Sequence, residues 1–210
     1  MKLYDFGRAP NPRRARIFIA EKGIDDIEIV QVDLGKLEQR GDEYRSLNPS
    51  CTVPALLLDD GTLITESIAI CRYFEELQPL PPLMGRNAIE KAQVEMWQRQ
   101  VEFQGFLPAG EAFRNYNKNF AGRAIAGPEN YEQIPELAVR GRTRVEHFLG
   151  ILDQRLGASE FVATDMFTIA DITAFIFIDF AGWSKIEIQE KHTNLQRWYQ
   201  TTKSRPSTDA

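Results

Sequence analysis

One stretch near residue 50 decides the fold of this chain: Asn48-Pro49-Ser50-Cys51-Thr52-Val53-Pro54-Ala55, together with the Glu66-Ser67 pair that follows it. Between them lie Leu56-Leu57-Leu58, the pair Asp60-Gly61 and then Leu63-Ile64, a pattern that predicts a strand, a tight turn and a second strand. Pro54 heads the first strand, where a missing N–H is tolerated. An apolar run with helical periodicity begins directly after Glu66-Ser67, so we expect a helix to start there.

The start of that helix has the chemistry to hold a small zwitterion. A helix N-terminus offers N–H donors without intrahelical partners and the positive end of a dipole. These N–H groups and the Ser67 hydroxyl can bind a carboxylate, while Glu66 can bind an ammonium group. The alternative interpretation is an ordinary hairpin followed by a capped helix, in which neither residue contacts a ligand.

The elements before this stretch complete an α/β domain. We expect strands at residues 2–6 and 27–32, and helices at residues 12–22 and 42–47, the second of which ends before Pro49. The order strand-helix-strand-helix-strand-strand-helix is the thioredoxin-like arrangement. Its first strand-helix-strand unit predicts parallel strands, and the hairpin predicts an antiparallel edge.

The rest of the chain is predicted to be all-α. Pro79, Pro81 and Pro82 indicate a stiff linker, so we expect a thioredoxin-like domain at residues 1–79, a linker at 80–87 and a helical domain at 88–210. The predicted helices of the second domain cover residues 88–120, 135–156, 169–180 and 194–202. The first of these is expected to bend at Pro108-Ala109-Gly110. Thr168-x-x-Asp171 predicts a capping box, so Asp171 has a folding role rather than a catalytic one.

The pattern NPxxxVPAL followed by ES resembles the glutathione-binding half of the cytosolic glutathione transferases, and the resemblance extends over residues 2–205. It implies that Pro54 is cis and that the backbone of Val53 pairs with the cysteinyl part of glutathione like an added strand. It implies also that Glu66 and Ser67 hold the γ-glutamyl end. Thr52, just before the Val53-Pro54 bond, matches a further contact position.

The glycine end of glutathione is where this chain departs from the family pattern. Gln39 lies near the position where several classes have a His that binds the glycine carboxylate, and Cys51 stands where those classes often have another His. We retain Gln39 as a glutathione-binding candidate. Cys51 is either a small filler or a thiol able to form a mixed disulfide with glutathione, whereas Cys71 lies on the apolar helix face and is expected in the core.

The candidate catalytic residue is Asn11. A free thiol with a pKa near 8.5 is only a few per cent ionised at neutral pH, so the site needs a donor that stabilises the thiolate. The loop between Gly7 and Pro12 holds no Tyr, Ser or Cys, and Asn11 is its sole uncharged polar side chain. The alternative is that Asn11 is only a helix N-cap. In that case the donor is Tyr4, a backbone N–H, or the positive potential of Arg8 or Arg13.

A second substrate would need an apolar wall, for which the long predicted helix supplies candidates. These are Phe106, Phe113 and Tyr116, with Phe103 and Leu107 nearby. Residues of this kind are more often part of a core or of a dimer contact than of a ligand wall.

The amino-acid composition of the chain limits the kinds of molecule that it is expected to bind. The net charge of −5 argues against nucleic acid or an anionic membrane, and no apolar run approaches the roughly 18 residues of a membrane span. The charged start of the chain predicts no signal peptide, and two cysteines suit a reducing cytoplasm. His147 and His192 are isolated, so no metal site is expected. The resemblance implies a homodimer, with Met96, Trp97 and Gln100 as contacts.

The function implied by the resemblance is that of a glutathione transferase, with glutathione as co-substrate and an electrophilic small molecule as acceptor. Two alternatives stay open. One is a glutathione-dependent disulfide reductase on the same site, with a lyase reaction as a variant. The other is a non-catalytic binding protein with the same fold.

Overall fold

The computed structural model describes all residues, Met1–Ala210, and the chain divides into two compact units. The α/β unit comprises Met1–Pro81, Ile125–Asn130 and Asp209–Ala210, and the helical unit comprises Pro82–Ala124 and Tyr131–Thr208. None of the helices combines the length and the apolar character that a membrane crossing demands.

The sheet of the α/β unit has the strand order β2-β1-β3-β4. Strand β1 pairs in parallel with β2, with Leu3 opposite Ile29, and antiparallel with β3, with Leu3 opposite Leu56. The β3–β4 hairpin is antiparallel, so the predicted thioredoxin-like topology is confirmed. The four strands are β1 (Lys2–Asp5), β2 (Glu28–Gln31), β3 (Ala55–Leu57) and β4 (Leu63–Thr65).

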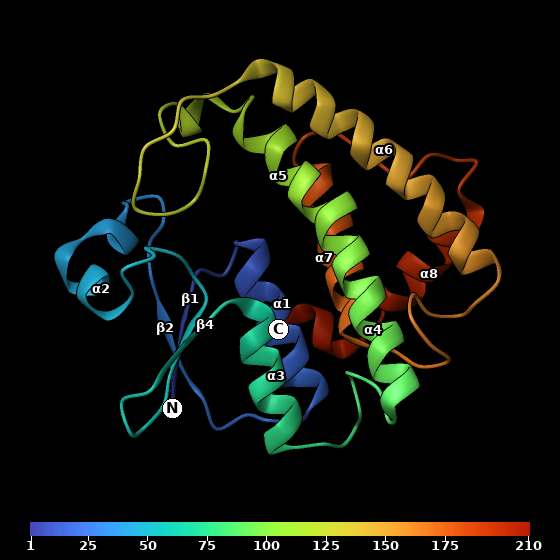
Figure 1. The fold of residues 1–210 in the computed structure, drawn as a ribbon, viewed down its shortest axis with the longest axis horizontal. Coiled ribbons are helices and arrows are strands. Elements are labelled where there is room, and N and C mark those ends of the chain that lie inside the picture. The colour runs from blue at the N-terminus through green and yellow to red at the C-terminus, as the bar shows by residue number, and fades with distance from the viewer. The chain divides into compact units, whose positions relative to one another are not determined.

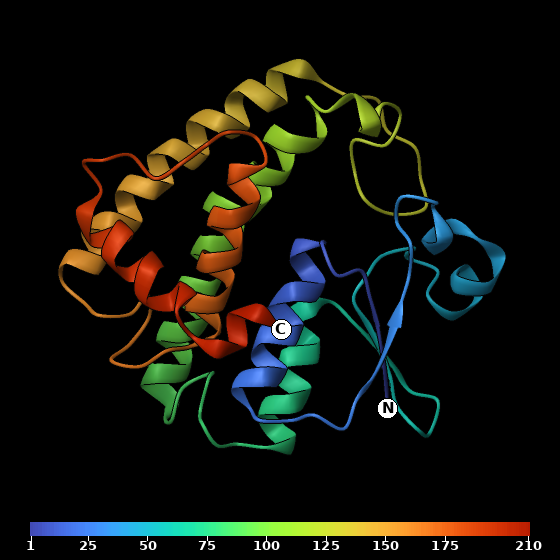
Figure 2. The ribbon, with the colours of Figure 1, turned by 180° about the vertical axis from the view of Figure 1, so that it is seen from behind.

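Three α-helices cover the two faces of this sheet. They are α1 (Pro10–Glu21), α2 (Asp42–Leu47) and α3 (Ser67–Leu77), with a 3-10 turn η1 (Glu38–Arg40) before α2. Figures 1 and 2 show α1 and α3 side by side on one side of the sheet and α2 on the other. Because α1 begins at Pro10 rather than at Pro12, the start of the helix includes Asn11.

Two apolar clusters hold the α/β unit together. Phe18, Ile70 and Phe74 are fully buried between α1, α3 and the sheet. On the other side lies the Val53 cluster. This cluster contains the buried residues Val32, Tyr44 and Val53, with Tyr4, Phe6, Leu34 and Leu47 packed against it. The residues around position 53 therefore stand on a packed base.

A buried ion pair joins the ends of α1 and α3. Lys22 is fully buried, and its ammonium contacts the carboxylate of Glu75, whose side chain is 8% exposed. The same ammonium donates to the carbonyl oxygen of Pro81 and lies 5.5 Å from the centre of the Phe18 ring. The sequence did not predict this pair, because Lys22 follows the last residue of its helix, a place where lysines are usually solvated.

The helical unit is arranged around one buried helix. All residues of α7 (Ile169–Gly182) except Asp179 and Gly182 are buried. In Figure 2, α7 (orange) lies beside α4 (green) and α8 (red). The other elements are α4 (Ala88–Gln100), η2 (Val101–Phe106), α5 (Leu107–Arg114), η3 (Lys118–Phe120), α6 (Pro135–Gly157), α8 (Thr193–Lys203) and η4 (Pro206–Asp209).

The prediction of one helix over residues 88–120 was wrong in two respects. The helix is interrupted by η2, a π-helical turn in which the N–H of Leu107 bonds to the carbonyl of Glu102, and it ends at Arg114. Pro108, which has no N–H to continue the normal ladder, follows two residues after the last residue of η2. At the other end, the Asn115 side chain accepts from the N–H of Ile134 at 2.9 Å and so fixes where the chain leaves α5.

The predicted capping box at the start of α7 is present. The buried Asp171 carboxylate accepts from the N–H and the hydroxyl of Thr168, both at 3.0 Å, from the N–H of Val162 at 2.8 Å and from the indole of Trp198 at 3.0 Å. Burial raises the pKa of Asp171 to about 6, although these donors oppose the rise. Asp171 therefore joins three segments of the helical unit, which agrees with a folding role.

Candidate functional site

The predicted zwitterion site lies at the start of α3. Glu66 is the residue before the helix and is exposed, with φ 69° and ψ 124°. Ser67 is the first helical residue and is 2% exposed. A non-glycine residue at positive φ costs on the order of 1–3 kcal/mol and persists only where its surroundings enforce it, often at ligand sites. Glu66 is thus an exposed carboxylate at the end of α3 where N–H groups lack intrahelical partners, and its side chain caps none of them.

The Val53-Pro54 peptide bond is cis, as the resemblance implied. The β1–β3 ladder begins at the pair Tyr4 and Ala55, so the N–H and the carbonyl of Val53 lie outside it. The carbonyl of Thr52 is already engaged, because it accepts from the hydroxyl of Tyr44 at 2.6 Å and from the amide of Asn48 at 2.9 Å. The N–H and the carbonyl of Val53 thus take part neither in this ladder nor in the bonds that hold Thr52.

Asn11 is not the N-cap of α1, so that alternative is wrong. The N-cap is Ala9, and Asn11 is the second residue of the helix, with an exposed side chain. Its side-chain oxygen accepts from the guanidinium of Arg14 at 2.7 Å, and Arg14 is only 5% exposed. Because a guanidinium has donors only, the amide atom that faces it is the oxygen, and the NH2 group of Asn11 is turned away from Arg14.

The starts of α1 and α3 are joined by a hydrogen bond. The Ser67 hydroxyl donates to the backbone carbonyl of Asn11 at 3.0 Å. The loop before α1 is held by Arg16, which contacts the Asp5 carboxylate and donates to the carbonyl of Gly7 at 3.0 Å. The structure therefore holds Asn11 and Ser67 next to each other, at the adjoining starts of α1 and α3.

The other proposed donors are less well placed. Tyr4 packs edge-on against Tyr44, with 5.7 Å between ring centres, and belongs to the Val53 cluster. Burial raises the pKa of Tyr44, which keeps its hydroxyl protonated as the donor to Thr52. Arg8 is exposed, and it is Arg14 that contacts Asn11. Sequence reasoning missed Arg14, although its position three residues after Asn11 places both on one helix face.

The glycine-end candidates lie on two segments. Gln39 is in η1, and its buried side-chain oxygen has no hydrogen-bond partner. Cys51 is 2% exposed and has φ 52°, and its sulfur lies 3.6 Å from the carbonyl of Pro49. Cys51 and Cys71 are both buried and form no disulfide, and Cys71 lies in the core as expected.

The predicted aromatic wall is only partly assembled. Phe106 and Phe113 both pack on Phe180, and their ring centres lie 5.7 Å and 5.6 Å from the ring centre of Phe180. The ring centre of Trp183 lies 5.4 Å from that of Phe113. Tyr116 is 82% exposed and lies outside this group. The structure thus brings two of the three predicted wall residues together, within the helical unit.

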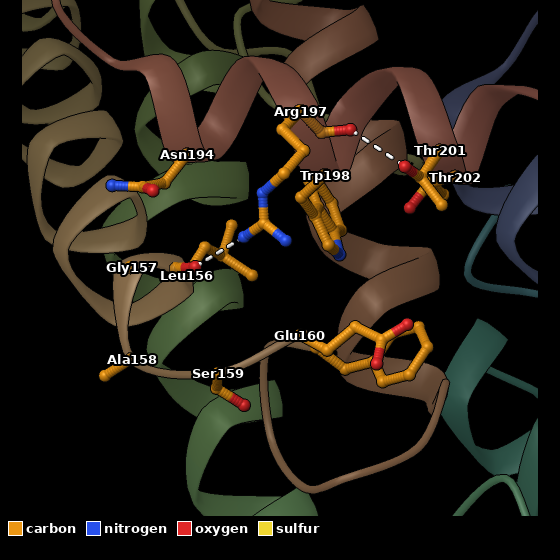
Figure 3. A pocket seen from close by; sticks show the side chains of 11 residues that line it. Leu156, Gly157, Ala158, Ser159, Glu160, Asn194, Arg197, Trp198, Thr201 and Thr202 are labelled. Atoms are coloured by element: carbon orange, nitrogen blue, oxygen red, sulfur yellow. Dashed lines mark hydrogen bonds between the residues drawn. The ribbon is translucent and has the colours of Figure 1, made fainter.

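A cavity of about 500 Å³ opens elsewhere in the helical unit (Figure 3). It lies between residues 156–161, at and after the end of α6, and residues 194–202 of α8. Arg197 projects into it but donates to the carbonyl of Leu156 at 2.7 Å, and Trp198 donates to Asp171. The polar side chains of Arg197 and Trp198 are thus occupied by bonds within the protein, and no predicted site residue lines the cavity. We therefore do not regard this cavity as the candidate functional site.

The comparisons with known proteins agree with the geometry. The sequence profile described as "Glutathione S-transferase, N-terminal domain" matches residues 9–77, and the one described as "Glutathione S-transferase, C-terminal domain" matches residues 106–206. Glutathione S-transferase 2 of Saccharomyces cerevisiae is 34% identical over 209 residues, which cover 99% of this chain and 87% of that protein. Glutathione S-transferase GstA of Escherichia coli O157:H7 is 30% identical over 177 residues, covering 83% and 80%.

Solved structures give the same result. The crystal structure of Gtt2 from Saccharomyces cerevisiae is 33% identical, covers 100% of this chain and 99% of its own, and superposes with a TM-score of 0.91. A glutathione S-transferase domain-containing protein from Marinobacter aquaeolei VT8 is 34% identical, with coverages of 99% and 100% and a TM-score of 0.89.

Proposed function

The chain belongs to the glutathione S-transferase family, and we propose that it joins glutathione to an electrophilic small molecule at a site formed by the starts of α1 and α3. Glutathione is the co-substrate. The observation that carries this assignment is the 3.0 Å hydrogen bond between the Ser67 hydroxyl and the Asn11 carbonyl, because it joins a carboxylate-binding helix start to a candidate thiolate donor.

Glu66 and Ser67 hold the γ-glutamyl end. The N–H groups at the start of α3 and the Ser67 hydroxyl donate to the α-carboxylate, and the exposed carboxylate of Glu66 pairs with the ammonium. A hydroxyl is a rotor, so Ser67 can exchange its bond to Asn11 for one to the ligand. Val53 then pairs through its free N–H and carbonyl with the cysteinyl part, and Thr52, Pro54 and Gln39 complete the site.

Asn11 stabilises the thiolate. Its NH2 group is exposed, is turned away from Arg14 and stands in the first turn of α1, where the dipole also favours an anion. A donor aimed at developing negative charge lowers the thiol pKa, which raises the fraction of the nucleophile that is ionised. The thiol proton is lost to solvent, and the thiolate sulfur forms a C–S bond to the acceptor carbon while the carbon–halogen bond of an aryl halide breaks with release of halide, or the C–O bond of an epoxide breaks and its oxygen takes up a proton. Phe106, Phe113 and Tyr116 remain the proposed wall for this acceptor.

No observation favours a disulfide reductase or a non-catalytic protein over transfer, and the relatives are named glutathione S-transferases. We also propose a cytoplasmic homodimer. Two buried cysteines that form no disulfide suit a reducing compartment, and the exposed Met96 of α4 offers an apolar contact.

Calorimetric titration with glutathione tests the binding site. Each variant leaves one charged end of the bound ligand without its partner, which costs about 2–5 kcal/mol where that end is buried in the complex, so Ser67→Ala and Glu66→Ala should each weaken binding at least tenfold. The matched control is Ser46→Ala, because Ser46 is exposed on α2 and donates only to the carbonyl of Glu43.

A panel of aryl halides, epoxides and a small disulfide, each with glutathione, tests the reaction class. Turnover of an aryl halide or an epoxide supports transfer, whereas turnover of the disulfide alone supports the reductase. Unchanged glutathione affinity in both α3 variants would falsify the site.

A further inference from the structure

A short piece of chain from the helical part of the sequence belongs to the α/β unit. Residues Ile125–Asn130, which we call the return loop, are assigned to the α/β unit, whereas Ala124 and Tyr131 on either side belong to the helical unit. Ala124 and Tyr131 are joined by a backbone bond of 2.9 Å, so the loop has a closed base.

Arg40 fastens the return loop. Its guanidinium donates to the carbonyl of Gly127 at 2.8 Å, to the carbonyl of Glu129 at 3.0 Å and to the side-chain oxygen of Asn130 at 2.7 Å. All three acceptors are uncharged, so the bonds fix the loop without neutralising the cation. Gly127 has φ 131°, which L side chains rarely adopt, and a Cβ built on it would lie 3.8 Å from the carbonyl oxygen of Ser50.

The loop thus reaches the two segments that carry the glycine-end candidates. Arg40 follows Gln39 in η1, and Ser50 precedes Cys51 and Thr52. The hydroxyl of Tyr44 in α2 bonds to Thr52, and Tyr44 packs on Val53, so α2 lies beside this backbone on the side of the sheet opposite α3 (Figure 1).

The direction of the bound tripeptide follows from these positions. The γ-glutamyl end is assigned to the start of α3 and the cysteinyl part to Val53, so an extended ligand directs its glycine away from α3. That is the side where η1, residues 50–52 and the return loop are tied together.

We propose that Arg40 is a positioning residue that holds the return loop as a wall around the glycine end of glutathione, and that this wall makes the site selective for ligands with that terminal residue. The inference rests on the proposed function, because the ligand direction comes from it. Gln39, whose buried oxygen lacks a partner, supplies the polar group beside the wall.

The test compares glutathione with γ-glutamylcysteine, which lacks the glycine. Arg40→Lys keeps the charge but cannot reach three acceptors in a fork. Gly127→Ala leaves every charge in place and disturbs the loop backbone. For each variant we expect glutathione binding to weaken about tenfold, equivalent to about 1.4 kcal/mol, while γ-glutamylcysteine changes less than about twofold. The control is Arg45→Lys, an exposed arginine on α2, with no expected change for either ligand.

Each outcome is decisive. Equal weakening for both ligands means that Arg40 only supports the fold, and the proposal fails. Selective weakening by Arg40→Lys without any effect of Gly127→Ala means that Arg40 acts directly rather than through the loop, which also overturns it. If Arg40→Lys does not fold, the selective effect of Gly127→Ala decides. Absence of glutathione binding by the wild-type protein refutes the proposed function itself and is recognised before any variant is compared.

Discussion

Replacing Lys22 by Met should destabilise the α/β unit severely. The change leaves the Glu75 carboxylate, 8% exposed, without its ammonium partner, and removes the bond to the carbonyl of Pro81. Breaking a buried pair by removing one partner costs about 3–5 kcal/mol. For a chain of this length each kcal/mol lowers Tm by about 2–4 °C, so we expect a loss of roughly 6–20 °C.

The double variant Lys22→Met/Glu75→Leu separates charge burial from packing. Replacing a whole buried pair by apolar side chains is often neutral or stabilising, so the double variant should recover most of the loss. The control is Arg72→Met, which breaks the exposed Arg72–Glu76 pair on α3, the helix that carries Glu75, and should cost about 0–1 kcal/mol. Urea unfolding followed by circular dichroism measures all three. The reasoning is refuted if Lys22→Met costs less than 1 kcal/mol, or if the double variant is no more stable than the single one.

Three further expectations concern the mechanism, the helical unit and assembly. Asn11→Ala should raise the pKa of the thiol of bound glutathione by about one unit or more, and Arg14→Met should raise it by a similar amount. The double variant should add nothing if Arg14 acts through Asn11, whereas additive shifts in thiolate absorbance contradict that link. Because the pKa of Asp171 is about 6 when folded and 3.8 when unfolded, its stabilising contribution is complete below pH 3.8 and is lost as the pH rises through 6. Over this pH range the free energy of unfolding should fall by about 3 kcal/mol. Asp171→Asn should abolish this fall, so a variant whose stability depends on pH as that of the wild type does would contradict the prediction. Sedimentation at micromolar concentration should give twice the monomer mass, and an added charge at Met96 should shift the protein toward monomer; a monomeric wild type rules out the dimer.

The sequence was sufficient for the order of strands and helices and for most helix starts. Local chemistry determines those features: Asp60-Gly61 marks the hairpin, and Thr168 with Asp171 marks the start of α7. Glu66 and Ser67, the two residues proposed to hold the γ-glutamyl end, were placed by the same reasoning at the start of α3.

The features that escaped prediction depend on contacts between distant segments. The π-helical turn contains Gly105, where a Cβ would come within 2.9 Å of the Phe148 ring, so its geometry depends on helix packing as well as on the nearby Pro108. Arg40 and Arg14 resemble any surface arginine in the sequence. Their roles appear only when the fold brings the return loop to one and buries the other.

The π-helical turn η2 has a consequence for how this chain can change over evolutionary time. A π-helical turn contains one residue more than the α-helical turn that it replaces, so it absorbs a single-residue insertion without unfolding the helix. Each residue of a regular α-helix rotates the following face by about 100°. A one-residue deletion within residues 101–106 therefore converts the π-helical turn into regular α-helix. The same deletion in α4 or α5 rotates one part of the helix relative to the other and turns Phe106 or Phe113 away from Phe180. Residues 101–106 are thus the segment of this helix where the loss of one residue leaves the hydrophobic register of α4 and α5 unchanged.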